Sequence, residues 1–227
     1  MAISTLSDLE KELAQASKGD VAIEAIRRFS TALSNTGERV AVFNAENALV
    51  NKAIRQEDAQ ALGFNHQDDC FVLLQGDIIT AESAYYLGER VTGNPKYTVL
   101  SSSCDLVPER RTCASLLRVT EIRKSEPDAG AKLNLLLQFK RTDSMYLPPL
   151  AVDGEDVICN AVQFDGICQI RSSELLLANR IASLSLVGWR IFSFFSRMVI
   201  GRSNPREGVI RSAIENQPVQ ESLELLK

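Results

Sequence analysis

The sequence predicts an α+β protein in which a small antiparallel β-barrel is flanked by helices at both ends of the chain. Two observations support this class. The first 63 residues and the segment after Ser172 carry apolar residues at the three- and four-residue spacing of helices. Between them, short runs rich in Val, Ile, Leu and aromatic residues are separated by Gly, Asn, Pro and Asp, which is typical of successive strands.

Three segments are expected along the 227 residues, a length that suits one large domain or a compact domain with helical additions. Residues 1–63 form an N-terminal helical segment, residues 64–177 form the β-barrel, and residues 178–227 form C-terminal helices that pack on the barrel. With 45% hydrophobic residues, the chain has enough apolar side chains to bury a core.

Three helices are predicted in the N-terminal segment. The first begins near Ser7 and has acidic residues in its first turn. The second is the stretch "VAIEAIRRFSTAL", whose apolar residues share one side. The third covers roughly Val40–Leu62 and ends at Gly63.

The middle segment predicts a series of short strands, because β-branched and aromatic residues favour extended backbone. These strands are expected at Phe71–Leu74, Ile78–Ser83, Thr98–Ser101, Ala114–Ile122, Leu133–Phe139 and Val157–Cys159. After them, the stretches "SSELLLANRIASLSL", "GWRIFSFFSRMVIG" and "NPREGVIRSAIENQ" are predicted to be helical.

The charge balance and the cysteines restrict the possible functions. The 25 basic and 29 acidic residues give a net charge of −4, which argues against a protein that coats nucleic acid but allows a local basic patch. The five cysteines are an odd number, and the N-terminal sequence lacks the basic start and apolar core of a signal peptide. We therefore expect a cytoplasmic protein with reduced thiols.

Three stretches of the middle segment occur in the order found in the MazF/PemK family of toxins, which they resemble. They are "QGDII" (Gln75–Ile79), "LGERVTGNPKYTVLSS" (Leu87–Ser102) and "ASLLRVTEI" (Ala114–Ile122). The resemblance implies an SH3-like barrel and ribonuclease activity. By position, it also implies that Arg90 stabilises charge on a phosphate during cleavage and that Thr120 positions the 2′-oxygen or the phosphate.

The chain also resembles a group of uncharacterised bacterial proteins that share a Ser-x-x-Cys-Asp-Leu loop after a strand. Here the loop contains Ser101, Cys104 and Asp105. A cysteine beside a carboxylate can be a reactive thiol, a point of a metal site, or part of a tight turn without chemistry. We interpret Cys104 as a small buried hydrophobe and Asp105 as an acceptor for backbone amides of the turn, because the sequence places no activating base beside the thiol.

No metal or cofactor is predicted. His66, Asp68, Asp69 and Cys70 lie close together, but without the CxxC or HxxxH spacing that zinc sites use. We interpret this cluster as a solvated turn before the first strand. The stretch "GNPK" is too short to be a phosphate-binding glycine loop, so nucleotide hydrolysis is not expected.

Lys96, Arg110, Arg111 and Arg118 belong to the densest local positive charge in the sequence. If the strands pair as in an SH3-like barrel, several of these side chains can share one face and contact a nucleic-acid backbone. The alternative is scattered surface charge balanced by neighbouring acidic residues.

Trp189, Phe192 and Phe195 recur at three-residue spacing and share one face of the last long helix. A face so apolar must be covered, either by the barrel and the N-terminal helices or by a protein partner or second copy of the chain. Arg190 and Arg197 lie within the same apolar stretch, which favours a packed helix over a membrane span.

Two hypotheses about function follow. The first is a non-enzymatic interaction or scaffold protein, within a bacterial or phage genome-conflict system such as phage defence or toxin–antitoxin. The slight acidity of the chain and its apolar C-terminal helix favour it. The second is a MazF/PemK-like RNA-binding protein or endoribonuclease, which Arg90 and Thr120 favour.

Overall fold

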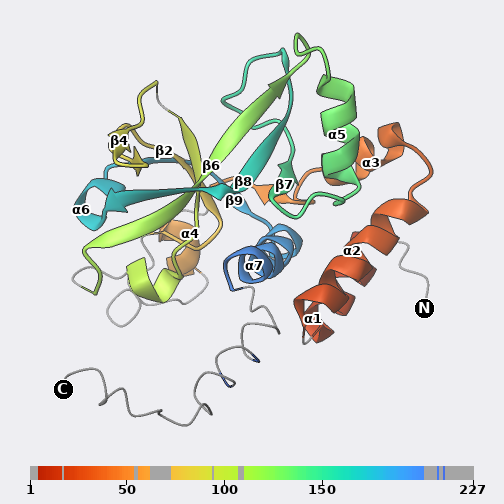
Figure 1. Cartoon of the computed structure of the whole chain (residues 1–227), viewed down its shortest axis with the longest axis horizontal. Coiled ribbons are helices and arrows are strands. Elements are labelled where there is room, and N and C mark those ends of the chain that lie inside the picture. The colour runs from red at the N-terminus through yellow and green to blue at the C-terminus, as the bar shows by residue number, and fades with distance from the viewer. Residues whose placement is uncertain are drawn as a thin grey trace, which may run out of the picture.

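The computed structural model describes residues 5–16, 18–53, 56–61, 73–93, 95–106 and 110–201, together with residues 209 and 212. The predicted α+β class is confirmed (Figure 1). A nine-stranded sheet runs in the order β1-β9-β2-β5-β6-β8-β3-β4, and β7 pairs with β8 beside this path. Every strand pairing of the described residues is antiparallel, and none joins the edge strands β1 and β4. The sheet is therefore open there, and the closed barrel expected from the sequence is not seen.

Most of the α-helices lie toward the two ends of the chain, and one of them, Ala129–Leu137, lies in its middle. The strands are β1 (Val50–Asn51), β2 (Asp77–Thr80), β3 (Tyr85–Tyr86), β4 (Glu89–Arg90), β5 (Lys96–Val99), β6 (Cys113–Arg123), β7 (Ser144–Leu147), β8 (Val157–Arg171) and β9 (Asn179–Leu184). The α-helices are α1 (Leu6–Gln15), α2 (Gly19–Ala32), α3 (Thr36–Phe43), α4 (Gln56–Ala61), α5 (Ala129–Leu137), α6 (Ser172–Leu175) and α7 (Leu186–Ile200).

The first two predicted helices are confirmed as α1 and α2. Helix α1 begins with a capping box, in which the Thr5 hydroxyl accepts from the Asp8 amide and the Asp8 carboxylate accepts from the Thr5 amide. The third prediction, Val40–Leu62, holds for Val40–Phe43 at the end of α3 and for α4 (Gln56–Ala61), and is wrong for the described residues between them. Helix α3 ends at Phe43, and the chain then pairs in the sheet through β1, because Val50 lies opposite Leu184 of β9.

The strand predictions hold for β6 and the start of β8, overlap in part with β2 and β5, and fail at Leu133–Phe139. Leu133–Phe139 was expected to be a strand, but it lies mostly in α5, whose Leu136 and Leu137 are buried against the sheet. A short apolar run fits a buried helix as well as a buried strand, and only its packing separates the two. Of the first predicted strand, Phe71–Leu74, only Leu73 and Leu74 are described, and neither is in a strand.

A strand replaces the helix that was predicted after Ser172. Helix α6 ends at Leu175, and β9 then enters the sheet between β1 and β2. Asp77 of β2 holds it there: the Ser183 hydroxyl donates to Asp77 Oδ1 at 2.6 Å, and Arg180 Nε lies 3.0 Å from Asp77 Oδ2. Burial raises the pKa of the Asp77 carboxyl, and these partners oppose that rise. The sheet thus includes residues expected among the C-terminal helices.

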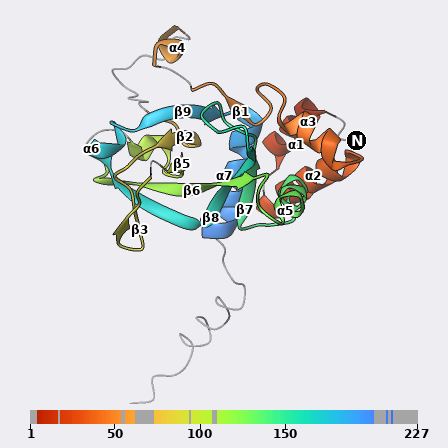
Figure 2. The same ribbon diagram turned by 90° about the horizontal axis from the view of Figure 1, so that it is seen from above.

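Both faces of the sheet are buried, and neighbouring residues on its strands divide between two apolar clusters. Ile78 and Leu117 belong to the larger cluster, which includes helices α1, α2, α5 and α7. Ile79 and Leu116 belong to the smaller cluster, on the side of α6. This alternation follows from the period of two along a strand. Figure 2 shows α7 lying between the sheet and the N-terminal helices.

Helix α7 is part of the core. Phe192 and Phe195 have 0% exposure, and the Phe195 ring stacks on that of Phe164 in β8 with centroids 5.7 Å apart. Of the two alternatives that the sequence left open for this face, packing within the chain therefore holds for Phe192 and Phe195, and neither ring is available to a protein partner. Trp189 is 38% exposed and donates from Nε1 to Gln75 Oε1 at 3.3 Å. Among the described residues, no helix is both long and apolar enough to span a bilayer.

Candidate ligand-binding site

A cavity of about 510 Å³ opens beside β6. Its walls come from β2, β5, β6, β9 and the loop before β8, so residues distant in sequence meet there. Polar and charged side chains prevail in its lining: Thr80, Lys96, Arg118, Thr120, Glu121, Arg123, Asp153 and Asn179. We call it the β6 cavity. Its volume lies within the range of about 300–1,000 Å³ that small-ligand pockets occupy.

An ion network forms the floor of the β6 cavity. Lys96 Nζ lies 2.8 Å from Glu121 Oε1, donates to Asn160 Oδ1 at 2.7 Å, and pairs with the Asp153 carboxylate. Asp153 Oδ2 also accepts from the Leu150 amide at 2.7 Å and from Asn160 Nδ2 at 2.6 Å. A buried charge needs such partners, because desolvation otherwise disfavours it. The network therefore ties the loop before β8 to strands β5 and β6.

Lys96, which the sequence predicts to contact a nucleic-acid backbone, is not a free cation in the structure. Its side chain is 7% exposed, and two carboxylates already compensate its charge. Its hydrogen bond also lowers the pKa of the Glu121 carboxyl, which Arg123 lowers further. Arg123 itself is exposed and pairs with Asp156 at 3.0 Å.

Arg118 differs from the other cations of the β6 cavity. Its guanidinium carbon lies 5.1 Å from the centroid of the Tyr86 ring, a cation–π contact, and the side chain is half-buried. Within the described residues, no hydrogen-bond acceptor or acidic side chain is paired with it. Gly166 of β8 makes room for it, since a Cβ there would stand 3.1 Å from the Arg118 Cβ. The pairing of β6 with β8 shifts register at this point.

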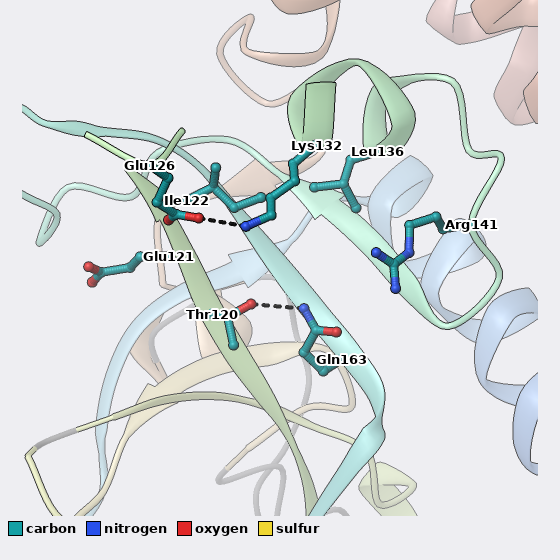
Figure 3. Close-up of a pocket in the computed structure, with 8 residues that line it drawn as sticks. All are labelled: Thr120, Glu121, Ile122, Glu126, Lys132, Leu136, Arg141 and Gln163. Carbon is teal, nitrogen blue, oxygen red and sulfur yellow. Dashed lines mark hydrogen bonds and ion pairs between the residues drawn. The ribbon is translucent and has the colours of Figure 1, made fainter. Parts of the chain in front are cut away.

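Thr120 lines the β6 cavity and also a second cavity of about 270 Å³, shown in Figure 3. We call the latter the α5 cavity. Gln163 Nε2 of β8 donates to Thr120 Oγ1 at 2.8 Å. The cations of the α5 cavity are paired: Lys132 lies 2.8 Å from Glu126 Oε2, and Arg141 lies 2.6 Å from Asp143 Oδ2.

Arg90 and Thr120, which the MazF/PemK resemblance pairs, lie apart. Arg90 is exposed on β4, where its Nε donates to the Glu82 carbonyl at 2.8 Å. The register runs from Arg90 through Tyr85 and Gln169 to Ser115 of β6. From Ser115 to Thr120, at about 3.3 Å per residue, is about 16 Å along the strand. Arg90 lines neither the β6 cavity nor the α5 cavity.

The Ser101–Asp105 loop forms a 3₁₀ turn, Ser103–Leu106, away from the β6 cavity. Cys104 is exposed, which corrects its interpretation as a buried hydrophobe. The Asp105 carboxylate lies 3.4 Å from Arg111 Nε, while Ser101 Oγ accepts from the Ser115 amide at 2.8 Å. Leu106, and not Cys104, is the buried apolar side chain of this turn.

Arg110 and Arg111 are exposed beside this turn and do not line the β6 cavity. Arg110 donates to the Cys104 carbonyl at 3.1 Å. Of the four predicted phosphate-binding residues, Lys96 and Arg118 therefore meet at one cavity, and Arg110 and Arg111 lie elsewhere.

No group of three or more His, Cys, Asp or Glu side chains in the described residues could hold a metal ion. The cluster of His66, Asp68, Asp69 and Cys70 lies outside those residues.

Among the residues that the sequence did not single out are Asp153 and Gln163, which line the cavities, and Asn160, which belongs to the ion network. The stretch that contains Asp153 predicts only a loop. Asn160 carried a usable signal, since it is a polar residue inside the apolar run "VICNAVQF" and is fully buried. Buried amides are hydrogen-bonded as a rule, so such a residue indicates a polar network.

No protein-family model matches the chain, and no curated protein matches it. The MazF/PemK resemblance therefore stays a prediction.

Proposed function

We propose that this chain is a non-enzymatic RNA-binding protein and that the β6 cavity holds a backbone phosphate of single-stranded RNA. One observation carries the proposal: Arg118 is a half-buried guanidinium in a polar cavity, and the described residues provide neither acid nor acceptor for it. A cation taken partly out of water without a counterion is costly. A bound phosphate would supply the missing charge.

The chemistry of the site suits a phosphate diester. A guanidinium offers planar N–H donors that match phosphate oxygens in bidentate geometry. Asn179, also in the lining, adds an amide that can donate to a further oxygen. The acidic residues of the lining, Glu121 and Asp153, are both paired with Lys96, so their charge is partly neutralised.

The placement of the predicted catalytic pair supports binding without cleavage. Arg90 on β4 lies too far from Thr120 on β6 for both to contact one phosphate, because strands β3 and β8 separate them in the sheet. The proposal retains the non-enzymatic interaction role that the sequence predicts, including a role in genome conflict. It changes the partner from protein to RNA, because Phe192 and Phe195 are buried.

The test is fluorescence anisotropy with labelled single-stranded RNA octamers of mixed sequence at low salt. Arg118→Ala should weaken binding about 10- to 100-fold, the effect of losing a hydrogen bond to a charged group. It should also reduce the slope of log affinity against log salt by about one. Arg90→Ala is the matched control, since it removes an exposed arginine outside both cavities and should leave affinity unchanged.

Two results would overturn the proposal. One is wild-type protein that binds none of the octamers at low salt. The other is an Arg118→Ala protein that melts like wild type and binds RNA equally well. Denaturing gels of the same mixtures test the non-enzymatic part, and shortened RNA with wild-type protein would show that the chain is a nuclease.

A further inference from the structure

The α5 cavity adjoins the β6 cavity, and the two share Thr120 and Glu121 in their linings. In Figure 3, Thr120 points from β6 toward Gln163 on β8, while Glu121 points to the opposite side of the strand. A ligand group held at Arg118 would therefore have a second compartment within reach, past Thr120. The two cavities also differ in chemistry.

The α5 cavity is poorly suited to another phosphate. Lys132 is compensated by Glu126 and by Asp128, with Lys132 Nζ 3.0 Å from Asp128 Oδ1. Arg141 donates from Nε and from its terminal nitrogen to the two oxygens of Asp143. A phosphate would have to displace a carboxylate from either cation. The side chains of Ile122 and Leu136 add apolar surface to the same cavity. Mixed walls of this kind fit a flat, neutral group with polar edges.

Among the described residues that line the α5 cavity, Gln163 is the one neutral amide. Its Nε2 donates to Thr120, which orients the amide, and within the described residues its Oε1 has no hydrogen-bond donor. One amide N–H and the Oε1 are thus left to a ligand. That donor–acceptor pair is the one that glutamine uses for adenine, which offers an amino donor beside a ring-nitrogen acceptor.

We infer that the α5 cavity takes the base next to the phosphate at Arg118, and that Gln163 makes the site prefer adenine. This inference rests on the proposed function, because it assigns a base to the same strand of RNA. Base recognition of this kind requires an unpaired nucleotide, whose edge is open to hydrogen bonds.

The experiment compares labelled octamers of adenylate, uridylate and cytidylate by fluorescence anisotropy. Wild-type protein should bind the adenylate octamer about 5- to 100-fold more tightly than the other two. Gln163→Ala should remove this preference and keep the salt-dependent binding that Arg118 supports. Gln163→Glu, which keeps the shape but loses the amide donors, should remove it too. Gln169→Ala is the matched control, because Gln169 is an exposed glutamine of the same strand outside the α5 cavity.

The outcomes separate the two claims. Equal affinity for the three octamers would overturn the adenine inference and leave the proposed function standing. So would an adenine preference that survives in Gln163→Ala with its melting temperature unchanged. Failure of every octamer to bind would end both.

Discussion

Gly188 of helix α7 lies directly against the carbonyl oxygen of Leu49, so closely that a Cβ atom built on the glycine would stand 2.1 Å from that oxygen. Ser185 holds the two segments together at the same point: its amide donates to the Leu49 carbonyl at 2.9 Å and its hydroxyl to the Ala48 carbonyl at 2.7 Å. The start of α7 is thus anchored to the backbone that leads into β1.

Gly188→Ala should therefore destabilise the protein, because the added methyl group meets backbone that cannot rotate away. Overpacking of this kind costs about 1–3 kcal/mol. Gly130→Ala in α5 is the control: a Cβ there meets nothing within 4 Å, and alanine favours the helix. Urea unfolding of both variants checks the pair. Equal stability of Gly188→Ala and wild type would contradict the close contact.

Phe192→Ala and Phe195→Ala should each lower the free energy of unfolding by about 3–5 kcal/mol, the cost of removing a buried aromatic ring. Both rings have 0% exposure. Since a domain has about 5–15 kcal/mol in total, unfolding or aggregation is expected at 37 °C. Leu186→Ala, at a residue 55% exposed on the same helix, should cost far less. Thermal melts followed by circular dichroism compare the three, and a melting temperature near wild type for both phenylalanine variants would refute the core role of α7.

The four cysteines that the structure describes should divide into two classes on alkylation of the native protein with iodoacetamide at pH 8. Cys104 and Cys113 are exposed, whereas Cys159 and Cys168 are buried. Burial also raises the pKa of the Cys159 thiol to about 12, so little reactive thiolate forms there. Peptide mapping should find Cys104 and Cys113 modified first. Modification of Cys159 at the same rate would show that the sheet opens far more readily than its packing implies.

Glu121 should make stability depend on pH in the acid range. Lys96 and Arg123 lower the pKa of its carboxyl below the ordinary value of 4.5, so the folded state favours the ionised form. The resulting stabilisation is fully present above about pH 4.5 and is lost as the pH falls through the lower, folded-state pKa. The difference in unfolding free energy between wild type and Glu121→Gln should therefore shrink on acidification from pH 6 to pH 3. A difference that stays constant would mean that the ion network does not hold Glu121 ionised.

The sequence by itself determined the features that depend on local periodicity and capping. The apolar faces of α1, α2 and α7 and the alternation along β6 are visible in the residue pattern, because the period of an element follows from its backbone geometry. The α+β class follows from the order of those patterns. The sequence also singled out Arg118, as part of the densest local positive charge, and Thr120, which the MazF/PemK resemblance implies as a catalytic residue together with Arg90.

The tertiary structure alone decided which element an ambiguous segment adopts and which side chains meet. Residues 133–137 became helix α5 and residues 179–184 became strand β9, since a short apolar run takes the form that its packing partners allow. The β6 cavity depends on pairings of the same long-range kind. Lys96 meets Asp153 and Asn160 across more than fifty residues of chain, and Arg118 is left as the cation of the β6 cavity that has no acidic partner among the described residues. Such contacts are set by strand register and burial, which no local pattern encodes.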